Sequence, residues 1–131
     1  MIEVLEQNGN VLCLQASGKL MHADYEQVLI PRLEQLIKEH GKARVLFAMG
    51  EEFHGWEPAA MWDDAKFGMK HRTDFEKCAV VGGPKWVEWA TKLGTLLVTG
   101  ECKTFPAKEL QQAQTWINAP LQASAKWEKR V

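Results

Sequence analysis

The segment Lys42 to Trp62 reads KARVLFAMGEEFHGWEPAAMW, and it decides how the rest of the chain is interpreted. Its first part, Ala43 to Met49, is a continuous apolar run apart from Arg44, which is typical of a central strand buried on both faces. Pro58 stands where the first turn of a helix accepts proline. The segment therefore predicts a strand, a loop and a helix. In an open α/β sheet, ligands and partners bind at such a loop.

Before this segment, residues 2–6 and 11–17 predict two strands joined by Asn8-Gly9-Asn10. Asn-Gly is a strong hairpin signal because both residues tolerate a positive φ. Alternate positions of the second strand are largely apolar on both faces, so we expect it to be covered on both sides.

A helix is predicted between this hairpin and the central strand. Gly18-Lys19-Leu20 breaks the strand pattern, and Asp24 is placed to cap a helix that runs to His40. Pro31 removes one backbone donor inside that helix, so a kink is expected there. Gly41 is a suitable residue to end the helix.

After the segment, strands and helices alternate. The pattern predicts helices over 59–71, 85–98 and 106–118 and strands over 77–81 and 103–105, with Gly82-Gly83-Pro84 as a turn. The complete order predicts an α/β fold, with a mixed sheet of about five strands and about four flanking helices. We expect one domain over residues 1–119 and a C-terminal tail over 120–131 that is partly disordered.

Composition excludes several classes of protein. The chain has 131 residues and a formal net charge of -1, without a basic run of the kind that binds nucleic acid. It contains no apolar stretch of membrane-spanning length, and its first residues lack the pattern of a signal peptide. The three cysteines are odd in number and far apart in sequence, which indicates free buried thiols and a cytoplasmic location.

No reaction is predicted from the motifs. The four histidines lack a second ligand at metal-binding spacing, and no serine or cysteine has the context of an activated nucleophile. The residues from Gly82 to Trp86 follow a strand and open a helix, so they could bind an anion or simply allow a tight turn. We therefore expect no metal, no cofactor and no catalytic residue.

Two groups of residues near the central segment are candidates for binding. The acidic group is Glu51, Glu52 and Glu57, which could complement a helix dipole or form an edge that recognises a partner. The apolar group could be core, a groove for a hydrophobic ligand, or a dimer surface. Its members are Phe53, His54, Trp56, Met61, Trp62 and Phe67.

The chain resembles the SpoIIAA-like bacterial proteins of the STAS superfamily, whose fold is also likened to the lipid-binding CRAL-TRIO domain. The resemblance extends to about Ala119, and it implies a mixed sheet flanked by helices but no established activity. It depends on Gly18 with Asp24, Pro31-Arg32-Leu33, Ala43 to Leu46, Phe53-His54-Gly55-Trp56, Ala60 with Trp62 and Asp64, Lys77 to Gly82 before Trp86, Thr104-Phe105, and Ala113 with Trp116-Ile117.

The resemblance leaves two hypotheses for function. Related anti-sigma-factor antagonists carry a phosphorylatable serine after the central strand, whereas the region between Met49 and Trp62 contains no Ser, Thr or Tyr. The first hypothesis is a non-catalytic module that binds a hydrophobic small molecule or lipid in an apolar groove near residues 53–69. The alternative is a STAS-type protein-interaction domain, with a protein partner or as a homodimer, that uses the acidic edge.

Overall fold

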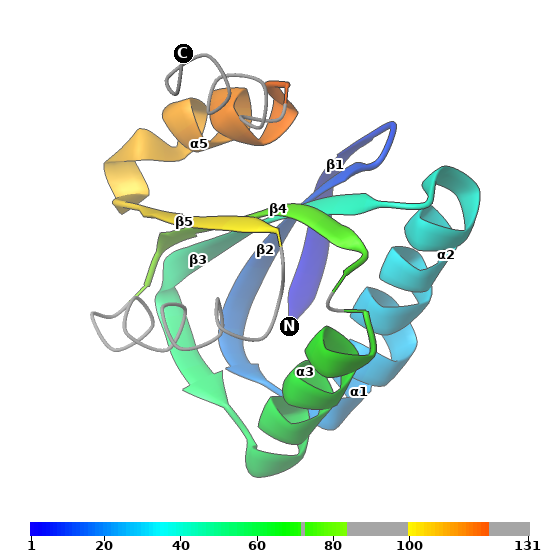
Figure 1. Ribbon diagram of the computed structural model, residues 1–131. Helices are drawn as coiled ribbons and strands as arrows, with labels where there is room; N and C mark the ends of the chain where they lie inside the picture. The colour runs from blue at the N-terminus through cyan, green and yellow to red at the C-terminus, as the bar shows by residue number, and fades with distance from the viewer. Residues whose placement is uncertain (72, 84–99, 121–131) are drawn as a thin grey trace.

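A mixed five-stranded sheet forms the centre of the protein (Figure 1). The computed structural model describes residues 1–71, 73–83 and 100–120. The strands are β1 (Ile2–Asn8), β2 (Val11–Leu20), β3 (Ala43–Trp56), β4 (Phe75–Gly82) and β5 (Glu101–Phe105). They are ordered β1-β2-β3-β4-β5, with β1 antiparallel to β2 and the other neighbours parallel. The predicted mixed sheet with an N-terminal hairpin is confirmed.

The hairpin turns at Gly9, whose φ of 60° needs a residue without a Cβ. Its second strand is longer than predicted, because Gly18 does not end β2. Instead Gly18 adopts a positive φ of 63° and pairs with Phe53, with register shifts on either side of it. The strand therefore bends and continues to Leu20, which extends the edge along which β3 can pair.

Helices α1 (His22–Asp24), α2 (Ile30–His40) and α3 (Pro58–Lys70) lie on one side of the sheet (Figure 1). A π-helical segment, η1 (Tyr25–Leu29), connects α1 to α2. The predicted single helix from Asp24 starts earlier, and Asp24 is not its N-cap. The Asp24 carboxylate instead accepts a hydrogen bond from the Met21 backbone N–H at 2.8 Å. Pro31 stands in the first turn of α2 and Gly41 ends that helix, as predicted for Gly41.

The other face of the sheet is covered by a 3-10 turn (Ala107–Glu109) and α5 (Leu110–Asn118) (Figure 1). The described part of the chain thus contains three helices longer than one turn, fewer than the four predicted. The predicted helix over 85–98, most of the Gly82 to Trp86 segment and the tail after residue 120 lie outside the described residues.

Strand β2 contributes to both cores, which confirms that it is covered on both sides. Leu12 and Leu14 pack beneath the helices α2 and α3, whereas Val11 and Cys13 pack towards α5. Successive side chains of a strand point to opposite faces of the sheet, so the four consecutive apolar residues 11–14 supply both cores.

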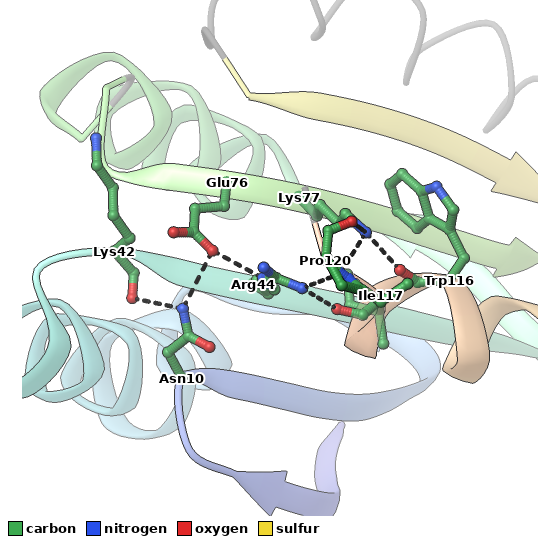
Figure 2. Close-up of polar contacts among 9 residues, drawn as sticks. Asn10, Lys42, Arg44, Glu76, Lys77, Trp116, Ile117 and Pro120 are labelled. Atoms are coloured by element: carbon green, nitrogen blue, oxygen red, sulfur yellow. Dashed lines mark hydrogen bonds and ion pairs between the residues drawn. The ribbon is translucent and has the colours of Figure 1, made fainter. Parts of the chain in front are cut away.

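A buried lysine holds the C-terminal end of α5 against β4 (Figure 2). Lys77 is 0% exposed, and its Nζ donates hydrogen bonds to the carbonyls of Trp116 at 2.7 Å and Ala119 at 2.8 Å. These carbonyls belong to the helix end, where intrahelical donors are lacking and the dipole favours a cation. Burial lowers the pKa of Lys77, and the neighbouring Arg44 lowers it further.

Arg44 of β3 makes the same kind of contact beside Lys77 (Figure 2). Its guanidinium donates to the carbonyl of Ile117 at 3.0 Å and forms an ion pair with Glu76 at 2.7 Å. The Asn10 side chain donates to the Glu76 carboxylate at 3.4 Å, which connects the hairpin turn to this network. The polar residue that interrupts the central apolar run is therefore a structural contact to α5.

Candidate functional site

The predicted loop from Glu51 to Trp56 is strand, which corrects the sequence-based expectation. Strand β3 continues without a break to Trp56 because the bent end of β2 offers it a partner. Phe53 pairs with Gly18, and Trp56 pairs with Leu20. The segment thus lies in the sheet beside α3, and Glu57 alone separates strand from helix.

The residues of the predicted apolar group differ in burial: two are buried, one is half-buried and three are exposed. Phe53 is buried and its ring lies 5.0 Å from that of the half-buried Trp56. Phe67 is also buried, in α3. His54 is exposed, and Met61 and Trp62 project from α3 with exposed fractions of 58% and 66%.

The predicted acidic edge is divided as well. Glu51 and Glu52 belong to β3, whereas Glu57 stands at the N-cap of α3. The Glu57 carboxylate accepts a hydrogen bond from the His22 backbone N–H at 2.6 Å. This bond connects the first turn of α1 to the start of α3, so Glu57 has a structural contact.

A pocket of about 230 Å³ lies between the sheet and the helices η1, α2 and α3. Strands β3, β4 and β5, with Trp56 of β3, form one wall, and Tyr25 of η1 and Phe67 of α3 contribute to the other. The lining is predominantly apolar with a few polar groups, as is common in small-molecule sites. The described lining residues are Tyr25, Leu29, Leu33, Val45, Phe47, Trp56, Asp64, Phe67, Gly68, Phe75, Cys78, Ala79, Val80 and Cys102.

Three polar side chains form a hydrogen-bonded chain in this pocket. The Trp56 indole N–H donates to the Tyr25 hydroxyl oxygen at 2.8 Å, and the Tyr25 O–H donates to Asp64 Oδ1 at 3.0 Å. Each bond runs in a fixed direction because indole is a donor only and a carboxylate is an acceptor only. The chain thus begins on β3, crosses η1 and ends at a carboxylate of α3.

The surroundings of this chain perturb both ionisable groups. Burial raises the pKa of the Tyr25 hydroxyl well above its ordinary value, and the Asp64 carboxylate raises it further, so Tyr25 stays protonated. Burial also raises the pKa of Asp64, and the hydrogen bond from Tyr25 opposes part of that rise. Asp64 lines the pocket and is exposed to solvent.

Two thiols face the same pocket from neighbouring strands. Cys78 of β4 is the register partner of Cys102 of β5, so cysteines that are far apart in sequence are adjacent in space. A hydrogen bond between the thiols raises the pKa of Cys78, which burial raises further, and lowers the pKa of Cys102. Free buried thiols were predicted; all three cysteines are free, but Cys13 alone is fully buried, whereas Cys78 and Cys102 are half-buried.

A second and larger concavity, of about 480 Å³, lies on the outer side of α3. Ile30 and Glu34 of α2 line one side, and Trp62 and Met69 of α3 line the other. Phe67 lines both this groove and the inner pocket. Trp62 and Met69 are largely exposed, so this surface is an exposed apolar patch rather than core.

Two of the described histidines, His22 and His71, form close ion pairs with aspartates. His22 Nδ1 lies 2.5 Å from Asp63, and His71 Nδ1 lies 2.9 Å from Asp74. No cluster of three or more metal-ligating side chains occurs within residues 1–71, 73–83 and 100–120. The hydrogen bond to Asp63 is the main cause that raises the pKa of His22.

Tyr25, Asp64 and the two pocket thiols were not among the residues predicted to form a site. One signal for Tyr25 was available, because a buried tyrosine needs a partner for its hydroxyl and this chain has a single tyrosine. In the sequence, Asp64 stands out only beside Ala60 and Trp62 in the family resemblance. Its role depends on Tyr25, which lies 39 residues away in sequence.

Comparisons with known proteins agree with this architecture. A family profile described as SpoIIAA-like matches residues 11–118. The crystal structure of an uncharacterised protein from Shewanella loihica with a SpoIIAA-like fold is similar at 32% identity and a TM-score of 0.70. The alignment covers 89% of this chain and 92% of the Shewanella loihica chain. No curated protein matches the chain. In the described residues, no helix is long and apolar enough to cross a membrane. The extent of the profile match shows that the chain belongs to the SpoIIAA-like family of the STAS superfamily.

Proposed function

We propose that this protein is a non-catalytic binding module that holds a hydrophobic small molecule in the pocket between the sheet and α3. The observation that supports this proposal is the combination of an apolar cavity with one oriented polar chain. Aromatic and aliphatic walls provide affinity, and a few fixed polar groups orient the ligand. The Trp56–Tyr25–Asp64 chain is such a group, positioned by three different elements.

The volume of the pocket limits the size of the ligand. An engineered protein cavity of about 150 Å³ binds benzene. The pocket here measures about 230 Å³, which suits one ring with a short substituent or an equally short aliphatic chain. A long acyl chain would need the outer groove as well.

Gly68 offers a direct test because it lines the pocket from α3. A Cβ built on Gly68 meets nothing within 4 Å, so a larger side chain fits there without a clash at its first atom. Gly68→Leu should place apolar volume in the pocket, and Gly68→Ala serves as the matched control with little added volume. Both changes remove a residue that weakens a helix, so neither is expected to unfold the protein.

The experiment titrates phenethyl alcohol into each protein and follows amide and indole signals by NMR. In the natural protein, the Trp56 indole N–H and pocket residues should shift in a saturable way. The shifts should persist in Gly68→Ala and be lost in Gly68→Leu. The proposal fails if no pocket signal moves in the natural protein, or if mass spectrometry shows the recovered probe to be chemically changed.

A second function is supported by a different observation, the exposed apolar side chains of α3. Met61, Trp62 and Met69 are 58%, 66% and 58% exposed, and Trp62 and Met69 border the outer groove. A STAS-type interaction domain would use such a patch against a second copy of the chain. Sedimentation over a range of concentrations should then show a dimer that Trp62→Asp abolishes. A monomer at every concentration would remove the homodimer from consideration.

A further inference from the structure

The polar end of the inner pocket carries a carboxylate, Asp64, without a cationic partner among the described lining residues. Its described hydrogen bond comes from the neutral Tyr25 hydroxyl. The Asp64 side chain keeps contact with solvent, and the partial desolvation of its carboxyl group raises its pKa.

The hydrogen-bonded chain makes this end of the pocket an acceptor. Trp56 donates to the Tyr25 oxygen, and the Tyr25 proton is directed to Asp64 Oδ1. The donors of the chain are therefore used within it, and the carboxylate is the group that remains to meet a ligand. A ligand that binds here must bring a donor, and a cationic donor gains most from a carboxylate in such surroundings.

The walls of the pocket suit the same kind of ligand. The rings of Tyr25, Trp56 and Phe67 border the space, and tryptophan and tyrosine attract cations through their faces. An anionic head group, by contrast, would meet Asp64 as a like charge, and no cation among the described lining residues would offset the repulsion.

We propose that the inner pocket binds a small amphiphilic cation, a primary amine joined to one ring or a short apolar chain, with its ammonium group on Asp64. This inference rests on the proposed function, because it assigns the ligand class of the same pocket. The apolar part of the ligand lies along the walls formed by β3, β4 and α3, and the ammonium donates to the Asp64 carboxylate. Fatty acids, which the family likeness suggested, are disfavoured.

Three probes with the same ring test the charge of the head group: phenethylamine, phenethyl alcohol and phenylacetate. Each is titrated at neutral pH and followed by NMR and calorimetry. In the natural protein, phenethylamine should bind about tenfold or more tightly than the alcohol, as expected for a charge-assisted hydrogen bond. Phenylacetate should bind most weakly.

Two variants test whether Asp64 causes this preference. Asp64→Asn keeps the shape and can still accept the hydrogen bond from Tyr25, so the preference for the amine should fall to about equal binding of amine and alcohol. Glu34→Gln is the matched control, because this carboxylate of α2 lines the outer groove and is not among the described residues of the inner pocket. The preference should be unchanged there.

The outcomes separate this inference from the proposed function. Equal binding of amine and alcohol to the natural protein, or tightest binding of phenylacetate, would overturn the amine assignment while leaving a ligand pocket in place. Absence of binding by all three probes would remove the proposed function as well. A preference that survives in Asp64→Asn would also overturn the assignment. The probe series on the natural protein decides the question even if a variant does not fold.

Discussion

At the scale of single residues, Lys77 shows how a charged side chain can be part of a core. Its stem crosses the interior and its ammonium group meets the carbonyls at the end of α5, so the charge has partners although it is fully buried. The sequence predicted a buried strand that begins at Lys77, whereas β4 begins two residues earlier, at Phe75. The acceptors come from residues about forty positions later, which strand periodicity cannot indicate.

Replacing Lys77 by methionine should therefore destabilise the protein. Lys77→Met removes a charged donor from the carbonyls of Trp116 and Ala119, which keep the Ala119 N–H and the Arg44 guanidinium as their other donors. The free energy of unfolding should fall by about 1–3 kcal/mol. Urea denaturation measures this loss. Lys108→Met is the matched control, because Lys108 is exposed and its replacement should change stability by less than about 0.5 kcal/mol. An equal effect of both variants would show that the buried contacts do not matter.

At the scale of elements, hydrogen bonds and ion pairs connect α1 to α3. His22 of α1 lies 2.5 Å from Asp63 of α3 and 2.7 Å from Glu26, and its backbone N–H donates to Glu57. These bonds hold α3 at the position where Asp64, the next residue, reaches Tyr25. The geometry of the pocket therefore depends on how α1 and α3 meet.

The contact between α1 and α3 should depend on pH. The hydrogen bond to Asp63, together with the charges of Asp63 and Glu26, raises the pKa of His22 above its value in the unfolded chain. The protonated form therefore favours the folded state, and the stabilisation is complete below the ordinary histidine pKa of about 6.5. It is lost as the pH rises through the raised pKa of the folded protein.

Thermal unfolding of His22→Gln and the natural protein measures this contribution. The difference in Tm between them should be largest at mildly acidic pH and should shrink as the pH rises above neutrality. The exposed His54 provides the control, since His54→Gln should give a difference that does not vary in this way. A pH-independent difference for His22→Gln would contradict the argument.

At the scale of the whole molecule, two cores share one sheet. The core beneath α2 and α3 and the core beneath α5 are separated by β2, β3 and β4, whose residues alternate between them. Such sharing implies that neither side can unfold while the other stays intact, because loss of either core exposes the same strands.

Ile117→Ala tests this coupling from the α5 side. Ile117 is 0% exposed, and its truncation should lower the free energy of unfolding by about 2–5 kcal/mol. The NMR signals of Trp116, in α5, and of Trp56, at the end of β3, should still disappear together as denaturant is added. Separate transitions for the two indoles would show that the two sides unfold independently.

The sequence by itself determined the elements whose signals are local. Period-2 alternation predicted β2 and its two-sided burial, Asn8-Gly9 predicted the hairpin, and Pro58 and Gly41 marked where a helix begins and another ends. The order of these local patterns along the chain was also enough to identify the family. They depend on neighbouring residues, so a reading along the chain can recover them.

The tertiary structure alone decided what those elements bring together. The bend at Gly18 lets β3 continue to Trp56 as strand, and register places Cys78 beside Cys102. The contact between Tyr25 and Asp64 depends on where η1 and α3 settle on the sheet. Each of these facts joins residues more than twenty positions apart, and such pairings follow from strand register and helix packing across the whole fold. The pocket therefore depends on how the sheet and helices pack, whereas the strands of the sheet can be predicted from local sequence patterns.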